Sequence, residues 1–376
     1  MKKKRVLIDV NSIITYIKTG CISGIGRTTY ELLKQWNLTL DQIPFEIVLY
    51  SLNTKGVTPK GLFKFRSVHF FWPNRDAYKK LLYYMHLRKL ATGYDIIHIP
   101  NNVDVIEDIE KTVLTIHDVM NYRFANEWNS AKWQCSDEEK KRMEYAASKC
   151  KAIITCSECS KNDIVKYLHV PEAKVYSIPW GINREMFKPT YNEDFIAKVG
   201  VKGLYYFTSS ANHPRKNLSL LLKSFSRYLE LGGKGQLVIL NPEEQYLEGY
   251  ESLMDAKSVI VLRNVSDMEL CVLYSHAHCT LMLSSYEGFG LPILESLACH
   301  TQVISANNSS LPEVGADIVD YVEDMSEDKI AQKLLSYDSK DKSRLLDEEK
   351  LESHLRHFSW RECANRYIEL YTTLLS

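Results

Sequence analysis

The sequence SSYEGFGLPILE occupies residues 284–295 and carries a glutamate on either side of two glycines and a proline. The preceding run CTLMLSS is typical of a strand, and the following ILESLACH is typical of the start of a helix. Pro292 suits the first helical turn, where its missing N–H is not needed. Gly288 and Gly290 let the backbone bend sharply and approach a ligand closely. The stretch therefore predicts a strand-to-helix turn at a binding site.

The helix that follows this turn is expected to offer an anion site. Its free amides and its dipole both favour a phosphate group. We place Glu295 in the first helical turn and Glu287 just before the bend, so that one carboxylate accepts hydrogen bonds from a ribose and the other from a sugar beyond the phosphates. The alternative is structural: Glu295 complements the helix dipole, and Glu287 is a solvated loop residue. The two glycines between them favour the binding interpretation.

The rest of the chain repeats short apolar runs separated by amphipathic stretches, which predicts an α/β fold with parallel sheets covered by helices. At 376 residues the chain is long enough for two domains. The run IPWGIN at residues 178–183 breaks both strand and helix patterns and is taken as the hinge. We therefore predict two doubly wound, Rossmann-like domains facing across a cleft, over residues 1–180 and 181–357, with a final helix over 358–376 packed on the first.

Composition and charge narrow the class of protein. Hydrophobic residues make up 45% of the chain and charged residues 25%, which excludes a disordered or fibrous protein. Residues 1–180 contain 27 Lys and Arg against 19 Asp and Glu, a balance of +8 that the remainder of the chain reverses. This asymmetry favours an anionic ligand or surface beside the first domain, and it is too small to indicate nucleic acid.

Targeting signals are weak in this sequence. Asp9 and Asn11 interrupt the apolar core of a signal peptide, so a first strand from Arg5 to Val10 is expected instead. No run approaches the roughly 18 apolar residues that span a bilayer. The nine cysteines are scattered and suit a reducing compartment, and the lone CxxC at residues 156–159 is interpreted as a strand end with a helix cap at Ser157. The predicted location is cytoplasmic.

Three other segments are candidates for the same cleft. Arg215 and Lys216 follow the predicted strand YYFTSS, where adjacent cations can neutralise a diphosphate, although an isolated pair is more often on the surface. His117 and Asp118 end the strand TVLTIHD, where a histidine can contact a sugar, although a lone histidine in apolar sequence is usually a core residue. The run SGIGRTT at residues 23–29 lacks the third glycine of a dinucleotide fingerprint, which argues against NAD and leaves a glycine-rich helix start.

The turn at residues 284–295 resembles the signature of the retaining glycosyltransferases of family 4, which have the GT-B fold: a glutamate, seven residues containing GFGLP, and a second glutamate. The continuation SANNSSLPEV at residues 305–314 is also similar to that family, especially to its mannosyltransferase-like members. The likeness extends over nearly the whole chain and is strongest from Phe207 to Val314. The resemblance therefore implies a sugar transferase with the predicted two-domain fold.

The resemblance also implies roles for the residues of the second domain. Glu295 would bind the nucleotide ribose, and Glu287 would contact the donor sugar. Arg215 and Lys216 match the donor-diphosphate motif of the family. Many relatives have a further cation or polar residue about five positions earlier, where this sequence has serines, so Ser210 would supply a hydroxyl instead.

For the first domain, the resemblance implies that His117 hydrogen-bonds the donor sugar. Asp118 would orient its loop or face the acceptor. The other implied contacts are the backbone of Phe289, Gly290 and Leu291 at the phosphate and sugar, Asn264 and Val265 at the nucleotide base, and Gly24, Gly26 and Arg27 at the diphosphate and acceptor.

Residues 74–94 combine lysines and arginines with tyrosines and leucines in a helical pattern. Such a helix can lie on an anionic membrane surface, or it can be an ordinary domain helix with a solvated basic face. The positive charge of the first domain favours the inner face of the cytoplasmic membrane, where a lipid-linked acceptor would be found.

The sequence thus predicts a retaining hexosyltransferase that moves a sugar from a nucleotide-diphosphate donor to a saccharide acceptor in bacterial O-antigen or capsule synthesis. GDP-mannose is the first choice of donor, and UDP-hexoses stay open. A non-catalytic nucleotide-sugar binder and an epimerase or phosphorylase of the same architecture are the alternatives. No Asp-x-Asp motif occurs in the sequence, so no metal and no cofactor are expected; the helix dipole and the two cations would stabilise the leaving group.

Overall fold

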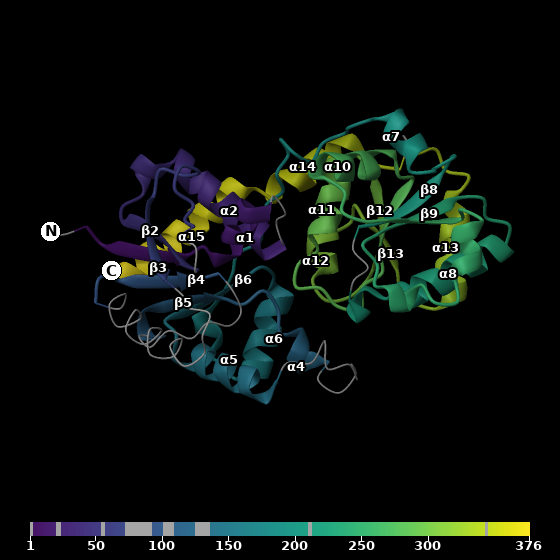
Figure 1. Cartoon of the computed structure of the whole chain (residues 1–376). Helices are drawn as coiled ribbons and strands as arrows, with labels where there is room; N and C mark the ends of the chain where they lie inside the picture. Colours follow the sequence, from purple (N-terminus) through teal and green to yellow (C-terminus); the bar gives the residue numbers. More distant parts are fainter. Residues whose placement is uncertain are drawn as a thin grey trace. The chain divides into compact units, whose positions relative to one another are not determined.

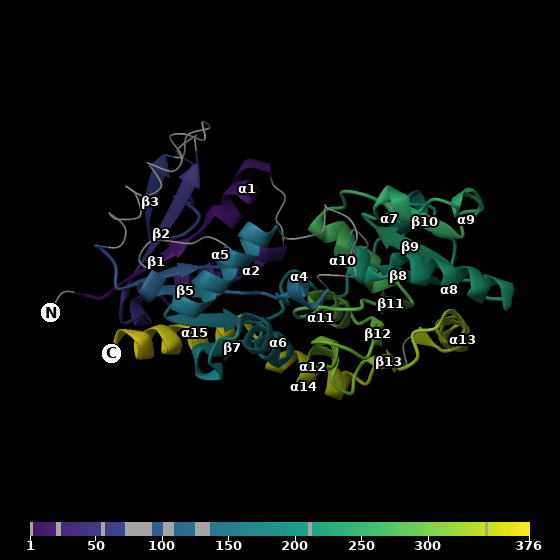
Figure 2. The same ribbon diagram turned by 90° about the horizontal axis from the view of Figure 1, so that it is seen from below.

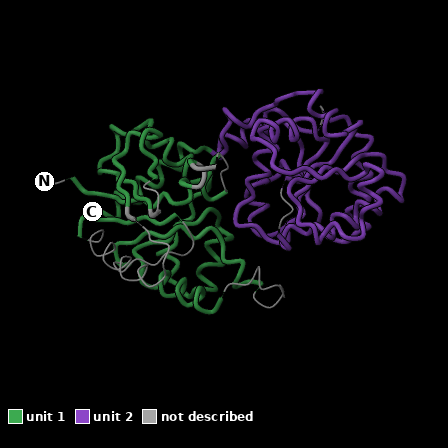
Figure 3. Tube along the Cα trace, in the orientation of Figure 1, with its two compact units in different colours: residues 1–181, 359–376 green, residues 182–358 purple. Residues whose placement is uncertain are grey.

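The structure is a computed structural model that describes residues 3–19, 24–53, 57–71, 92–100, 109–124, 136–209, 213–342 and 345–376. It divides the chain into two compact units (Figure 3). Unit 1 consists of Met1–Gly181 together with Ser359–Ser376, and unit 2 consists of Ile182–Phe358. Each unit is built on one parallel sheet with helices on its faces (Figures 1 and 2). The basic helix predicted over residues 74–94 lies mostly outside the described ranges, and so does Ser210.

Unit 1 contains a seven-stranded sheet in the order β3-β2-β1-β4-β5-β6-β7, and its paired strands are all parallel. Alternate residues of each strand point to opposite faces, so Val6 and Ile8 join one core cluster while Leu7 joins the other. Because both faces are covered by helices, the central strands are mostly apolar and buried. The strands are β1 (Arg5–Asp9), β2 (Glu46–Asn53), β3 (Arg66–Phe71), β4 (Ile96–Ile99), β5 (Thr112–Thr115), β6 (Ala152–Thr155) and β7 (Val175–Ser177).

Helices from both ends of the chain cover one face of this sheet, and α5 and α6 cover the other. Serine side chains cap α5 and α6, since Ser136 accepts a hydrogen bond from the amide of Glu139 and Ser157 accepts one from the amide of Ser160. The helices of unit 1 are α1 (Asn11–Thr19), α2 (Gly24–Leu38), α4 (Met120–Arg123), α5 (Asp137–Lys149), α6 (Glu158–Leu168) and α15 (Trp360–Leu375), with 3-10 turns η1 (Leu40–Gln42), η2 (Ile109–Lys111) and η3 (Glu172–Lys174).

The last helix, α15, belongs to the core of unit 1. The Trp36 indole N–H donates to the carbonyl of Ala364 at 3.0 Å, and the Tyr371 hydroxyl is bonded to Nδ1 of the buried His98 at 2.7 Å. The chain leaves unit 1 and returns to it at adjacent points, because a Cβ atom on Gly181 would lie 2.1 Å from the backbone nitrogen of Trp360. Only a glycine leaves room for these two segments to run so close together.

Unit 2 contains a six-stranded parallel sheet in the order β10-β9-β8-β11-β12-β13. Helices α8 and α13 cover one face, and α11 packs against β11, β12 and α10 on the other. The strands are β8 (Tyr205–Thr208), β9 (Gln236–Leu240), β10 (Val259–Leu262), β11 (Cys279–Met282), β12 (Gln302–Ala306) and β13 (Asp320–Val322). The helices are α7 (Glu193–Lys198), α8 (Leu218–Glu230), α9 (Glu251–Asp255), α10 (Asp267–His276), α11 (Leu291–Ala298), α12 (Leu311–Gly315), α13 (Glu327–Tyr337) and α14 (Glu348–His357), with 3-10 turns η4 (Pro214–Lys216) and η5 (Glu244–Tyr246).

The strand order of unit 2 fixes where a ligand can approach. After β8 the chain runs outward to β9 and β10, and it then returns to the other side of β8 as β11. Such a reversal leaves a crevice at the carboxyl ends of the two central strands, which is where open α/β sheets bind ligands. The loops that follow β8 and β11 contain Arg215, Lys216 and Glu287. Among the helices in the described ranges, none is long and apolar enough to cross a bilayer.

Candidate functional site

The loops after β8 and β11 are bonded directly to each other. The amide of Ser285 donates to the carbonyl of Arg215 at 2.7 Å, and the Asn217 side-chain amide donates to the carbonyl of Leu283 at 2.9 Å. Asn217 has φ +52° and connects η4 to α8, a conformation that asparagine adopts more readily than most residues. These bonds hold the two cations of one loop beside the first glutamate of the other.

Glu287 is buried and makes ion pairs with both cations. The Lys216 ammonium lies 2.7 Å from Oε1, and the Arg215 guanidinium contacts Oε2. The Ser284 hydroxyl also donates to Oε1 at 2.7 Å, and the Arg215 guanidinium donates to the carbonyl of Tyr286 at 3.0 Å. The structure therefore joins the predicted diphosphate and sugar residues in one cluster. It also shows that Glu287 is neither solvated nor unpartnered.

The charges in this cluster control each other. Burial alone would raise the pKa of Glu287, but Arg215 and Lys216 lower it to about 2. Burial lowers the pKa of Lys216, and the Glu287 carboxylate opposes that shift. Burial, with Arg215 and Lys216 beside it, lowers the pKa of His213 to about 4, so this imidazole is uncharged at neutral pH. Two cations thus share one carboxylate, and such a pair of cations can also bind an anion.

A serine-rich loop after β12 fixes the backbone around Glu287. The Glu287 amide donates to the Ser309 hydroxyl at 2.9 Å, and the Ser310 hydroxyl donates to the carbonyls of Glu287 at 2.9 Å and Phe289 at 2.6 Å. The Asn308 side-chain amide donates to the carbonyl of Ser284 at 3.0 Å. The sequence motifs assign no role to Asn308, Ser309 and Ser310. The available signal was a run of Asn and Ser directly after a strand, where such side chains bond to backbone groups.

The turn into α11 has the predicted form, with one correction. Gly290 has φ +121°, and Pro292 is the second residue of the helix. The Phe289 ring is buried, and its centroid lies 6.0 Å from that of the Phe358 ring. Only the backbone of Phe289 can therefore face a ligand. Glu295 was expected in the first turn, but it is the fifth helical residue and the first turn contains no acidic residue. This position removes the helix-dipole explanation for Glu295, because that effect is confined to the terminal turn.

Glu295 lies one helical turn into α11 and is 9% exposed. Its Oε2 accepts a hydrogen bond from the Tyr274 hydroxyl at 2.9 Å. The negative charge of Glu295 also affects the ion cluster, because it raises the pKa of Lys216. The two glutamates of the signature are therefore both linked to Lys216.

The residues predicted to hold the nucleotide base lie at the carboxyl end of β10. Asn264 is exposed and has φ +54°. Its backbone amide donates to Oδ1 of Asn241 at 3.1 Å. Val265 is half-buried. Ser266 and Glu269 then form the expected capping box at the start of α10. Strand β9 separates β10 from β8, so this turn lies at the same edge of the sheet and apart from the ion cluster.

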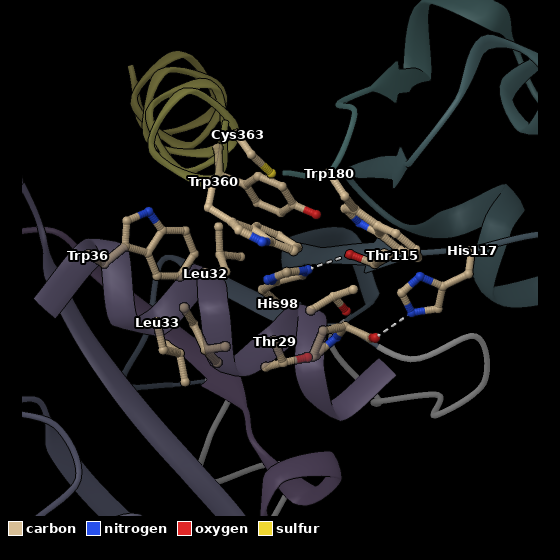
Figure 4. Close-up of a pocket in the computed structure, with 14 residues that line it drawn as sticks. Thr29, Leu32, Leu33, Trp36, His98, Thr115, His117, Trp180, Trp360 and Cys363 are labelled. Carbon is tan, nitrogen blue, oxygen red and sulfur yellow. Dashed lines mark hydrogen bonds between the residues drawn. The ribbon is translucent and has the colours of Figure 1, made fainter. Parts of the chain in front are cut away.

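In unit 1, His117 lies just beyond the end of β5. Its Nε2 donates to the carbonyl of Pro100 at 3.0 Å, and its ring lies 5.3 Å from that of Trp180 (Figure 4). Burial lowers the pKa of His117, which favours the neutral imidazole. Asp118 accepts a hydrogen bond from the amide of Met120 at 3.2 Å, so it shapes the loop.

The start of α2 lies beside the same small cavity as His117. Thr28 and Thr29 line this cavity, whose volume of about 20 Å³ is enough for one water molecule and not for a sugar (Figure 4). Gly24 is exposed at the first position of α2, Gly26 is buried, and Arg27 is half-buried. Unit 1 therefore groups its candidate residues at the carboxyl edge of its own sheet.

Two family models match this chain and together span most of it. The model for glycosyl transferases group 1 matches residues 192–346, and the model for glycosyltransferase family 4 matches residues 22–186. The chain belongs to the family 4-like glycosyltransferases. The match boundaries place the ion cluster in the group 1 region and His117 in the family 4 region of this glycosyltransferase.

Curated relatives and solved structures extend this result. The glycosyltransferase is 29% identical to a probable sucrose-phosphate synthase of Thermosipho melanesiensis over 62% of this chain and 56% of that protein. It is 25% identical to O-antigen chain mannosyltransferase B of Escherichia coli over 80% of each chain. Anabaena Alr3699/HepE in complex with UDP and glucose has the same fold, with a TM-score of 0.72 at 12% identity over 98% of this chain and 100% of that one. The fold is therefore GT-B.

The ion pairs of Glu287 predict a pH dependence of stability. The pKa of Glu287 is about 2 in the folded chain against an ordinary value of 4.5, so its ionised form stabilises the fold above pH 4.5, and this contribution is lost as the pH falls towards 2. Glu287→Gln should lower the free energy of unfolding by about 3 kcal/mol near neutral pH and have a much smaller effect at pH 2. Urea unfolding of both proteins between pH 2 and 7 measures the difference.

Glu230→Gln is the matched control, since Glu230 is exposed at the end of α8 and pairs with Arg227, three residues earlier in the same helix, at 2.9 Å. It should change the free energy of unfolding by less than about 0.5 kcal/mol at any of these pH values. A Glu287→Gln effect that stays constant from pH 7 to pH 2 would contradict the ion-pair description.

Proposed function

We propose that this glycosyltransferase moves a hexose from a nucleotide-diphosphate donor to a saccharide acceptor with retention of the anomeric configuration. The observation that carries the proposal is the buried cluster in which Arg215 and Lys216 share Glu287. In this cluster two cations share one carboxylate, and Glu287 lies four residues before α11 begins. Such a site suits a diphosphate, because charged hydrogen bonds and helix-start amides act together on it.

The reaction needs charge stabilisation and orientation more than it needs a protein nucleophile. In the proposed step, an acceptor hydroxyl attacks the anomeric carbon from the face that the diphosphate leaves. The bond from that carbon to the phosphate oxygen breaks, the diphosphate keeps the electron pair, and its oxygen takes the acceptor proton. Arg215 and Lys216 stabilise the charge that develops on the leaving group. Glu287, held by both cations, orients the hexose.

The remaining candidate residues receive roles around this step. Glu295 binds the ribose, His117 contacts the hexose as a neutral imidazole, and Asp118 shapes the loop that carries it. The other proposed contacts are the backbone of Phe289, Gly290 and Leu291 with the phosphate and sugar, Asn264, Val265 and Ser210 with the donor, and Gly24, Gly26 and Arg27 with the diphosphate and acceptor.

We propose GDP-mannose as the donor. The Escherichia coli relative that aligns with 80% of this chain is an O-antigen chain mannosyltransferase, which supports mannose and surface polysaccharide synthesis. A UDP-hexose is the alternative, because the Anabaena neighbour of the same fold is in complex with UDP and glucose. The sucrose-phosphate synthase relative supports transfer to a saccharide without indicating which one.

Binding of nucleotide sugars tests the donor and the diphosphate cluster together. GDP-mannose should raise the melting temperature of the protein, because a ligand that binds only the folded state stabilises it. Lys216→Met should weaken this binding roughly 10- to 100-fold, the cost of one charged hydrogen bond. Differential scanning fluorimetry and calorimetry with GDP-mannose and UDP-glucose measure both effects.

Lys223→Met is the control for this experiment, since Lys223 is an exposed lysine on α8 whose removal should leave binding unchanged. Stabilisation by UDP-glucose and not by GDP-mannose would overturn the donor assignment. Equal affinity of the Lys216→Met variant and the unsubstituted protein would contradict the diphosphate assignment. An inverted anomeric centre in the product would contradict retention, and binding without turnover of any acceptor would favour a non-catalytic binder.

We also propose that transfer needs no divalent metal. Arg215, Lys216 and the start of α11 supply the positive charge that a metal would otherwise bring to the diphosphate. Sugar transfer, measured as nucleoside diphosphate release, should continue at an unchanged rate in excess EDTA. Loss of activity in EDTA that returns with Mg²⁺ or Mn²⁺ would contradict the proposal.

The acceptor is proposed to be a lipid-linked saccharide at an anionic membrane surface. A groove of about 610 Å³ in unit 1 supports this, because Lys3, Lys4, Arg5, Lys111 and Lys151 line it at the amino ends of the strands. Two of these cations are partly neutralised, since Lys4 lies 3.2 Å from Asp95 and Arg5 lies 3.2 Å from Glu46. Each lysine near an anionic bilayer contributes roughly 1 kcal/mol to binding.

Vesicle binding tests this surface. The protein should sediment with vesicles that contain phosphatidylglycerol and not with pure phosphatidylcholine, and the bound fraction should fall as salt increases. Reversing two exposed charges, Lys3→Glu with Lys151→Glu, should weaken binding roughly 10-fold or more. The pair Lys198→Glu with Lys202→Glu in unit 2 is the control. Binding that is equal for both double variants would exclude this groove as the membrane contact.

A further inference from the structure

Tyr274 makes a buried hydrogen bond to Glu295, the second glutamate of the signature. Its side chain lies on α10 and is fully buried. Its hydroxyl donates to Oε2 of Glu295 on α11 at 2.9 Å. The Ser209 side chain, just beyond the end of β8, opposes the rise that burial causes in the pKa of Tyr274. Tyr274 thus interacts with Glu295 on α11 and with Ser209 after β8.

A buried tyrosine hydroxyl needs a partner, and in this unit the solution is either a backbone carbonyl or a carboxylate such as Asp320, which accepts from Tyr337 at 2.6 Å. The neighbouring Tyr205 shows the simpler one, because its hydroxyl donates to the backbone carbonyl of Leu273 at 2.6 Å. Tyr274 donates to the charged group of the signature instead. Burial raises the pKa of Tyr274 well above 10, so this hydroxyl is protonated and acts as a donor at any physiological pH.

The ring of Tyr274 is held in place on its own account. It packs edge-to-face on Phe207 at 5.1 Å and on Phe187 at 6.4 Å between ring centroids. The hydroxyl therefore occupies a fixed point, and the bond it makes restrains Oε2 of Glu295. A carboxylate has about four lone-pair positions, of which the bond from Tyr274 occupies one and two vicinal ligand hydroxyls would occupy two more.

We propose that Tyr274 is a positioning residue that orients Glu295 to accept the two vicinal hydroxyls of the donor ribose. This inference rests on the proposed function, which assigns Glu295 to the ribose. Its consequence is specific: Tyr274 governs the preference for a ribose over a sugar without these hydroxyls, and it leaves the diphosphate contacts of Arg215 and Lys216 alone. A site built to bond a hydroxyl discriminates strongly against the analogue that lacks it.

The experiment compares binding of nucleoside diphosphates with and without the ribose hydroxyls. GDP and 2′,3′-dideoxy-GDP, with UDP and its dideoxy analogue in parallel, are titrated into the full-length protein by calorimetry. The unsubstituted protein should prefer the ribose form roughly 10- to 100-fold. Tyr274→Phe should reduce this preference to roughly threefold or less, mainly by weakening the ribose form, while the affinity for the dideoxy form stays almost unchanged.

Tyr205→Phe is the matched control, because it removes another buried hydroxyl of the same unit that does not contact Glu295. It should keep the full ribose preference. Ser209→Ala provides a second, milder variant that leaves the tyrosine in place, and it should lower the preference by a smaller factor. This variant keeps the proposal testable if Tyr274→Phe does not fold.

The outcomes separate this inference from the proposed function. If neither GDP nor UDP binds the unsubstituted protein, the proposed function fails. If one of them binds with a clear ribose preference that both Tyr274→Phe and Ser209→Ala retain, the function stands and Tyr274 is not a positioning residue. Binding without any ribose preference in the unsubstituted protein contradicts the assignment of Glu295 and the inference built on it.

Discussion

The buried ion pairs of Glu287 with Arg215 and Lys216 are the interaction on which the rest of the site depends. A carboxylate with this little exposure is costly unless it is paired and hydrogen-bonded, and one partner lost would leave an uncompensated buried charge. Both partners come from a different loop, so the cluster exists only because β8 and β11 are neighbours in the sheet. The serines after β12 complete the arrangement by bonding the backbone on either side of Glu287.

The position of this cluster follows from topology. Strand order reverses beside β8, and the loops on the two sides of that point supply the cations and the first glutamate. The second glutamate, Glu295, lies one turn into the helix that begins there, and it interacts with Lys216 as well as with Tyr274. A ligand that contacts both Glu287 and Glu295 would therefore bind to one cluster of interacting charges. The charged groups of this cluster are already oriented, so they reorganise little when charge develops on the ligand.

Local patterns in the sequence predicted much of the fold and of the site. They missed the features that depend on contacts between residues far apart in the chain. Alternating apolar runs indicated parallel sheets, and the glycines and Pro292 indicated the turn into α11, because those signals are carried by adjacent residues. The pairing of Glu287 with Arg215 joins positions 72 apart, and periodicity does not show which strands are neighbours. The first-turn placement of Glu295 was wrong because α11 begins only at Leu291. A final helix packed on the first domain was predicted, but nothing in the sequence identified His98 as its partner there.

The backbone contact between Gly181 and Trp360, where the chain leaves and re-enters unit 1, affects the order in which the two units can fold during synthesis. Unit 2 is one continuous stretch inserted into unit 1, whose core takes Tyr371 and Trp360 from the far end of the chain. A ribosome releases all of unit 2 before it releases α15. The inserted half can thus complete its core during synthesis, while the half that is begun first must wait for the last helix, the reverse of the usual order for successive domains.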